Sequence, residues 1–263
     1  GYYDKGIFDL AGDDANNSDL KAASKALVPI LKDYQKFLED DVLPRSTGNW
    51  RIGKKRFAEK LLLELDAGVT ADEVLQEAEA EATRVENEMY VIARQLWQQV
   101  FRKQRLPVDD DKGRRETIRL VLEETSKEHG KADDLIVDAR AGVEKIKRFI
   151  KEKDILRLPA PDRLKLIEMP EFQRGFSIAY LNSAPPLDAK AASYYAISPP
   201  PRDWDARRVK SFMEEYNRHI LQILTIHEAY PGHYVQLEYA NRHPSSIRKI
   251  YSSGVFAEGW AVY

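Results

Sequence analysis

Apolar residues recur at three- and four-residue steps through most of the first 155 residues, the pattern of helices that bury one face. This pattern predicts helices at 20–38, 56–65, 70–105, 113–128 and 132–151. Thr70 and Glu73 form a capping box, and the run from there to Arg105 has no proline or glycine. That run predicts one helix of about 30 residues or more, which is long for a globular protein.

The pattern changes after Ile155, where prolines and short apolar segments replace the charged helices. Strands separated by proline turns are predicted at 164–169, 176–181 and 193–197. A helix follows, capped by Asp203 or Asp205, and its apolar face continues as far as His227. The sequence therefore predicts a mainly α fold, with a small β-sheet inserted before the helix that carries His227.

Length, charge and cysteine content narrow the class of protein. The 263 residues are enough for one large domain with a sizeable core. The 41 basic and 43 acidic residues nearly balance, which argues against a nucleic-acid partner held through phosphate contacts. Because the chain has no cysteine, any transition metal must be bound by His, Asp or Glu. The oligomeric state stays open.

The two ends of the sequence bear on membrane association and length. No run reaches the roughly 18 apolar residues of a membrane-spanning helix. The opening, GYYDKGIFDL, lacks the basic start and apolar run of a signal peptide. The last segment, GVFAEGWAVY, stops at Tyr263 within an apolar, helix-like pattern. This favours a fragment of a longer protein, truncated at its C-terminus.

The segment HEAYPGH, from His227 to His233, carries the strongest chemical signal in the chain. Zinc peptidases commonly use H-E-x-x-H on a helix, where the spacing brings both imidazoles to one face and the glutamate polarises the metal-bound water. Here the histidines are six residues apart. Six residues of a straight helix turn roughly 600° and rise about 9 Å, so the two rings would diverge.

Pro231 and Gly232 indicate how this spacing could be accommodated. Pro231 has no N–H to donate to the carbonyl of His227, and it disfavours helical geometry at Tyr230. Gly232 permits the unusual dihedral angles of a tight re-entry into helix. We therefore expect a local bulge or break that returns His233 to the position of a second metal ligand.

A third ligand is needed, and Glu258 is the best candidate. Glu238 lies five residues after His233, roughly 140° away around a helix, so it should face elsewhere. Glu258 lies in the apolar segment GVFAEGWAVY, where an ionised carboxylate would be costly to bury without a cation. The expected zinc ligands are His227, His233, Glu258 and a water, with Glu228 as the general base.

An extended peptide substrate needs an edge strand to pair with, and the predicted strand 193–197, which includes Ile197, is the candidate. An ordinary buried strand that ends at the following proline turn is an equally good interpretation. Tyr230, Tyr194 or Tyr195 could donate a hydrogen bond to the oxyanion that forms when the scissile carbonyl is attacked. Spacing alone does not choose among them.

Three segments carry a resemblance to a known family: SYYAISPPPRDW, EEYNRHILQILTIHEAYPGHYVQLEYA and FAEGWAVY. They resemble the bacterial domain-of-unknown-function 885 family (DUF885), which has an HE-x-x-P-G-H motif and an E-G-W-A motif. DDVLPRSTGNWRIGKKRF matches more loosely, so the resemblance covers nearly the whole chain. This family is similar to the gluzincin metallopeptidases, whose mostly helical fold is that of carboxypeptidase Taq or neurolysin.

The resemblance implies a helical zincin-like fold and the same four site residues, with His227, His233 and Glu258 as metal ligands and Glu228 as base. Residues 1–155 would be a helical region, and 156–263 the sheet and metal-binding helices of the same catalytic domain. Members are about twice this length, and residues that stabilise the transition state would lie after Tyr263. The chain would then be an inactive fragment of a bacterial peptidase, and relatives often carry export signals.

Two other classes of function stay open. A metallohydrolase that cleaves a non-peptide amide or ester would have the same zinc site. A non-catalytic helical interaction protein could use HEAYPGH as a structural turn. Zinc content separates the second class from the enzymes, and the effect of replacing Glu228 separates catalysis from simple metal binding.

Overall fold

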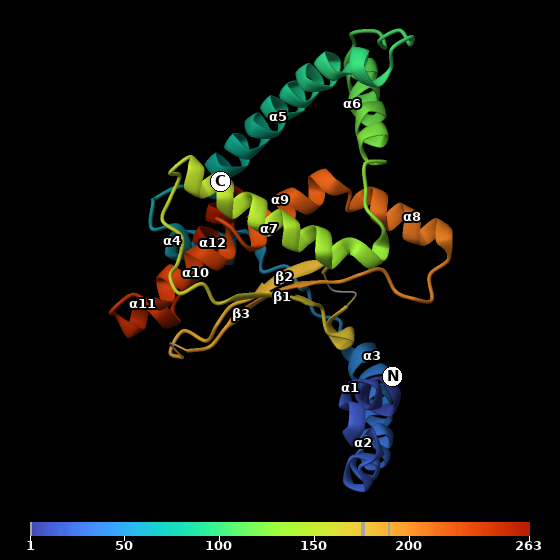
Figure 1. The fold of residues 1–263 in the computed structure, drawn as a ribbon. Helices are drawn as coiled ribbons and strands as arrows, with labels where there is room; N and C mark the ends of the chain where they lie inside the picture. The colour runs from blue at the N-terminus through green and yellow to red at the C-terminus, as the bar shows by residue number, and fades with distance from the viewer. Residues whose placement is uncertain (1, 175–176, 189) are drawn as a thin grey trace. The chain divides into compact units, whose positions relative to one another are not determined.

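The computed structural model describes residues 2–174, 177–188 and 190–263. The protein is mainly helical with a small three-stranded sheet, as predicted (Figure 1). Its chain forms two compact units, the first from residues 1–57 and 170–174 and the second from 58–169 and 175–263. The predicted division at residue 155 stays a prediction. Within the described part, no helix combines the length and apolar character needed to cross a membrane.

The first unit consists of helices, of which α2 (Ser18–Phe37) is the longest. Asn17 caps α2, because its side chain accepts hydrogen bonds from the backbone N–H groups of Asp19 and Leu20. The shorter helical segments are η1 (Tyr2–Gly6), α1 (Ile7–Ala11), η2 (Gly12–Asn16), η3 (Leu38–Val42), α3 (Leu43–Arg45) and η5 (Glu171–Gln173). The predicted helix at 20–38 is confirmed.

The long helix predicted from Thr70 is confirmed as α5 (Ala71–Val100), which has 30 residues. Both halves of the capping box form, with Glu73 hydrogen-bonded to the N–H of Thr70 and Thr70 accepting from the N–H of Glu73. The neighbouring α6 (Asp111–Thr125) packs Val121 against Trp97 of α5. α4 (Gly53–Leu65) precedes this pair.

The sheet has the strand order β1-β3-β2. The strands are β1 (Leu164–Glu168), β2 (Ala179–Asn182) and β3 (Ser193–Ile197). β3 lies in the centre, parallel to β1 and antiparallel to β2. Of the two interpretations of 193–197, the buried strand is therefore confirmed and the edge strand is wrong, since both sides of β3 are paired. The second predicted strand began at Phe176, which lies outside the described residues.

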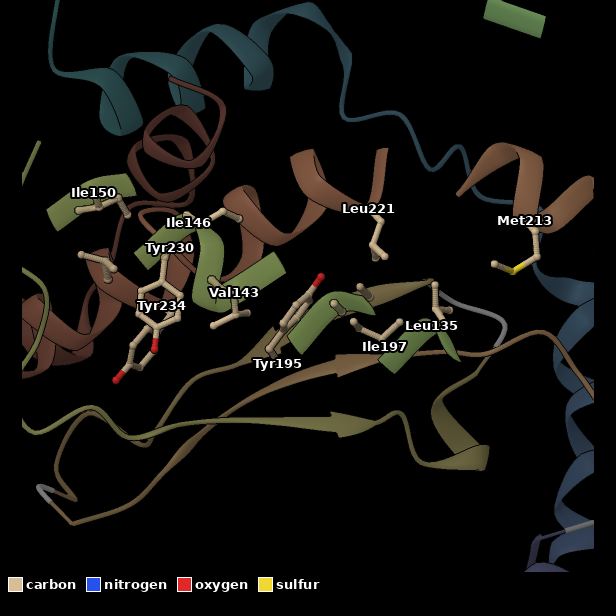
Figure 2. Close-up of a cluster of buried hydrophobic side chains, with 14 residues drawn as sticks. Leu135, Val143, Ile146, Ile150, Tyr195, Ile197, Met213, Leu221, Tyr230 and Tyr234 are labelled. Atoms are coloured by element: carbon tan, nitrogen blue, oxygen red, sulfur yellow. The ribbon is translucent and has the colours of Figure 1, made fainter. Parts of the chain in front are cut away.

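The main core lies between this sheet and two helices, α7 (Leu135–Glu152) and α9 (Arg218–Glu228), which cover one of its faces (Figure 2). α7 follows the short η4 (Ala132–Asp134). Its buried residues recur at the helical spacing that the sequence predicted: Leu135, Ala139, Val143, Ile146 and Ile150. They pack with Tyr195 and Ile197 of β3, so the sheet supports the helices that lead to HEAYPGH.

The helix predicted to run from Asp203 or Asp205 to His227 is two helices, α8 (Ala206–Glu215) and α9. Asp205 caps the first, and Asn217 caps the second through hydrogen bonds from two backbone N–H groups. The prediction of one continuous helix is wrong because the Asn217 side chain competes with the helical hydrogen bonds at that point. The chain continues through α10 (His233–Asn241), α11 (Ser246–Ile250) and α12 (Gly254–Val262).

Candidate metal centre

The helix breaks within HEAYPGH, as predicted. α9 ends at Glu228, α10 begins at His233, and four residues join them, with a cis peptide bond before Pro231. The N–H of Gly232 donates to the carbonyl of Ile226 at 3.0 Å. A Cβ atom on Gly232 would lie 1.8 Å from the carbonyl oxygen of His227. Only glycine allows the chain to pass this close to the end of α9.

The break brings the two imidazoles together. The ring centroids of His227 and His233 are 4.6 Å apart, and the ring planes are nearly perpendicular at 82°. Both rings are largely shielded, with exposed fractions of 26% and 12%. The geometric prediction for Pro231 and Gly232 is confirmed, because two residues beyond the usual spacing are absorbed without separating the rings.

Glu258 reaches the same point from α12. Its Oε2 lies 3.6 Å from Nε2 of His227 and 3.6 Å from Nε2 of His233. Two ligands bound at about 2.1 Å to a tetrahedral zinc ion lie about 3.4 Å apart, so this donor set fits zinc. Trp260, two residues further along α12, donates its indole N–H to the carbonyl of Pro231 at 2.9 Å. This bond ties α12 to the break.

The expected burial of Glu258 is wrong, since 69% of its side chain is exposed. α12 presents the carboxylate at the surface, and its nearness to the two imidazoles is what marks it as a ligand candidate. Glu238 faces elsewhere, as expected. It is buried and forms ion pairs with Arg163 and Arg242.

Glu228, the predicted base, is a buried carboxyl at the end of α9. Burial raises its pKa above the ordinary value, and the charges of His233 and His227 partly offset that rise. The backbone of Leu181 in β2 also hydrogen-bonds this carboxyl and favours its ionised form. Glu228 is therefore a carboxyl whose proton affinity is increased next to the candidate ligands, the property a general base needs.

Hydrogen bonding in the sheet places the backbone groups of Leu181 on the outer edge of β2. Ser198 donates its N–H to the carbonyl of Ile178 at 2.7 Å, so in this antiparallel pair every second residue of β2 is bonded to β3. The residues between, Leu181 among them, direct their backbone groups away from β3. In the described part of the chain, β2 is the edge strand beside Glu228.

Three of the predicted substrate residues, Tyr195, Ile197 and Tyr230, lie in the core. Tyr195 and Ile197 are fully buried, and the hydroxyl of Tyr195 lies 3.2 Å from that of Thr225. Tyr230 is also buried, and it donates its hydroxyl to Asp162 at 2.6 Å. Tyr194 is half-buried in the centre of the sheet. Tyr195 and Tyr230 therefore have packing and hydrogen-bonding roles within the protein.

Asp162 and its partner Lys147, which support the HEAYPGH segment, were not identified from the sequence. Asp162 accepts hydrogen bonds from Tyr230 and Tyr234, and Lys147 forms an ion pair with the same carboxylate at 2.7 Å. The four-residue spacing of polar groups along residues 230–242 was the available signal. Nothing near Asp162 in the sequence points to its partners.

The fold and site together define a mainly helical protein with a small sheet and a His/His/Glu cluster at a helix break. Residues 6–263 match the family described as bacterial protein of unknown function, DUF885, and the chain belongs to this family. No curated protein matches it.

Two solved structures are similar over 99% of this chain. A predicted lipoprotein of unknown function from Shewanella oneidensis is 29% identical with a TM-score of 0.71, and the match covers 47% of that chain. A predicted lipoprotein from Colwellia psychrerythraea is 19% identical with a TM-score of 0.65, and the match covers 45% of it. The chain thus spans about half the length of these structures.

Proposed function

We propose that the protein is a zinc-dependent hydrolase, and specifically a peptidase. His227, His233 and Glu258 are the proposed ligands, and Glu228 is the proposed general base. The observation that carries this proposal is the convergence of two imidazole nitrogens and one carboxylate oxygen, all within 4.8 Å of one another, beside a buried glutamate. A helical zincin-like fold is part of the same proposal.

The chemistry assigned to each residue follows from its surroundings. When bound, zinc would polarise the scissile carbonyl and lower the pKa of a coordinated water. Glu228 would accept the proton of the attacking water and pass it to the leaving amine. Its buried position raises its pKa above the ordinary value, which favours proton uptake. His227, His233 and Glu258 leave one position of a tetrahedral site open for water or substrate.

A peptide is the proposed substrate because the outer edge of β2 adjoins the base. The backbone of Leu181, on the outer edge of β2, hydrogen-bonds Glu228. An extended peptide added alongside β2 would form backbone hydrogen bonds and place a peptide bond near the metal centre. This role replaces the one that the sequence suggested for β3, which is paired on both sides.

We also propose that the protein acts outside the cytoplasm. The support is that both similar solved structures are described as predicted lipoproteins from bacteria. Cell fractionation with an antibody against the native protein tests this location, and recovery in the cytoplasmic fraction alone would contradict it.

The test of function combines zinc content with the Glu228→Gln substitution. We expect stoichiometric zinc in the full-length protein with and without Glu228→Gln, and a loss of peptide-library hydrolysis of about 10²- to 10⁴-fold in the variant. Glu152→Gln, at the exposed end of α7, is the control and should hydrolyse normally.

Each contrary outcome selects another function. Hydrolysis that survives Glu228→Gln undiminished would remove Glu228 as the base. Cleavage of small amides or esters but of no peptide would identify a non-peptide metallohydrolase. Absence of stoichiometric zinc from the carefully prepared protein would favour a non-catalytic interaction protein.

A further inference from the structure

Polar side chains at four-residue spacing lie along one side of α10 and its flanking residues, and all of them bond to residues 160–163, here named the 160–163 loop. These side chains are Tyr230, just before the helix, Tyr234 and Glu238 within it, and Arg242, which caps its C-terminus. Side chains four residues apart share one face of a helix, so a single short loop contacts the whole face.

Asp162 is the centre of this contact. Tyr230 donates its hydroxyl to both carboxylate oxygens, at 2.6 and 2.8 Å, and Tyr234 donates at 3.0 Å. Lys147 of α7 lies 2.7 Å from the same carboxylate. The hydroxyl of Tyr234 in turn accepts the N–H of Arg163 at 2.8 Å. Hydrogen bonds to an ionised group are shorter and stronger than neutral ones, so this cluster resists displacement.

The far end of α10 is attached to the same loop. Glu238 is buried and pairs with Arg163 at 3.1 Å and with Arg242 at 2.7 Å. Arg242 also donates to the carbonyl of Ala160 at 3.0 Å. The loop is therefore fixed to α10 on both sides of Asp162, which gives the carboxylate a rigid base.

We infer that Asp162 is a positioning residue for the proposed zinc site, an inference that rests on the proposed function. Tyr230 and Tyr234 bracket the three residues that end at His233, and Asp162 holds both tyrosines. The connection between α9 and α10 lacks a regular helical hydrogen-bond ladder. Side-chain bonds to Asp162 thus set the direction in which α10 leaves the break, and with it the distance from His233 to His227.

The experiment measures zinc affinity by chelator competition in the full chain, in three variants of the cluster and in one control variant. Partners that orient metal ligands from outside cost about 10- to 100-fold in metal affinity when replaced, so we expect a loss in this range for Asp162→Asn. Tyr230→Phe should lose a smaller factor. The double variant should be no weaker than Asp162→Asn alone, because both changes remove the same link.

Tyr239→Phe is the matched control. This tyrosine is also on α10, but its hydroxyl donates to the carbonyl of Arg157, outside the cluster on Asp162. We expect its zinc affinity to change less than about twofold, which is within the measurement error of such a comparison. The visible spectrum of bound Co²⁺, which depends on ligand geometry, should shift in Asp162→Asn and not in Tyr239→Phe. The melting temperature of each metal-free variant separates loss of positioning from loss of folding.

Several results would overturn the inference. One is zinc binding by Asp162→Asn with unchanged affinity and Co²⁺ spectrum, and another is an equal loss in Tyr239→Phe. If Asp162→Asn does not fold, Tyr230→Phe decides alone, and unchanged affinity there counts against the inference. An unsubstituted protein that binds no zinc overturns the proposed function itself, which is a distinguishable outcome.

Discussion

The ligand candidates come from two regions with different surroundings. His233 is 12% exposed and follows a break whose tyrosines are buried and bonded to Asp162. Glu258 is 69% exposed, and the hydrogen bond from Trp260 to Pro231 links its helix to the break. The imidazole pair is thus set by the interior of the protein, whereas the carboxylate is free to adjust. We interpret the helix break from Glu228 to His233, here named the corner, as preorganised. Glu258 is then the ligand that adjusts its position to the metal.

The largest expected effect comes from a substitution that changes the backbone path of the corner. In Gly232→Ala the new Cβ would lie 1.8 Å from the carbonyl oxygen of His227, so the connection must move. We expect a loss of about 3 kcal/mol or more in the free energy of unfolding, together with loss of zinc binding. Urea denaturation of the metal-free protein and a zinc titration measure the two effects.

Gly259→Ala in α12 is the matched control for that variant. Nothing lies within 4 Å of the Cβ it would add, and the residue is inside a helix. Alanine should stabilise α12 by about 0.5–1 kcal/mol and leave zinc binding intact. A Gly232→Ala protein as stable as this control would show that the corner is not rigid.

Glu258→Gln tests the exposed side of the comparison. Removal of a ligand should weaken zinc binding by more than the roughly 100-fold upper limit for outer partners. The unfolding free energy of the metal-free protein should change by less than about 0.5 kcal/mol, as for other surface substitutions. Isothermal titration with zinc and thermal unfolding measure these quantities. A variant with unimpaired zinc affinity would remove Glu258 from the ligand set.

The smallest expected effect is the pH dependence of the stability that the cluster around Asp162 contributes. Burial would raise the pKa of Asp162, but hydrogen bonds from Lys147 and Tyr230 outweigh it and hold the pKa below the ordinary value of 3.8. A carboxyl with a lower pKa in the folded state contributes stability above its unfolded pKa, and this is lost as the pH falls through the folded value.

The stability difference between the metal-free protein and Asp162→Asn should therefore be constant from neutral pH down to about 4 and shrink below it. Urea midpoints at a series of pH values measure this difference. A gap that persists unchanged to pH 2 would show that the charge of Asp162 contributes nothing to the cluster.

Local patterns predicted most of the helices, because capping residues and apolar spacing act within a few residues of one another. The capping box of Thr70 and Glu73 is an example, since both partners lie in one helical turn. The break at Pro231 and Gly232 could be predicted for the same reason. The stop at Asn217 could not, because the apolar spacing continues through it while the side chain caps a new helix.

Features that depend on distant segments could not be predicted from local patterns. The central place of β3 depends on its pairing with β1 and β2, and nothing within residues 193–197 records that order. The surface position of Glu258 also could not be predicted. An apolar segment predicts burial, but whether other segments cover it depends on the rest of the fold. Asp162 lies 68 residues before Tyr230, so only the folded chain shows that the two meet.

The connection between α9 and α10 also limits how this family can change its length. The path of this connection is closely confined, since Gly232 passes against the carbonyl of His227 and Tyr230 is bonded to Asp162. A residue added or removed there would change the position of His233 relative to His227 and that of Tyr234 relative to Asp162 together. Relatives should therefore keep the length of this connection and change it only through substitution.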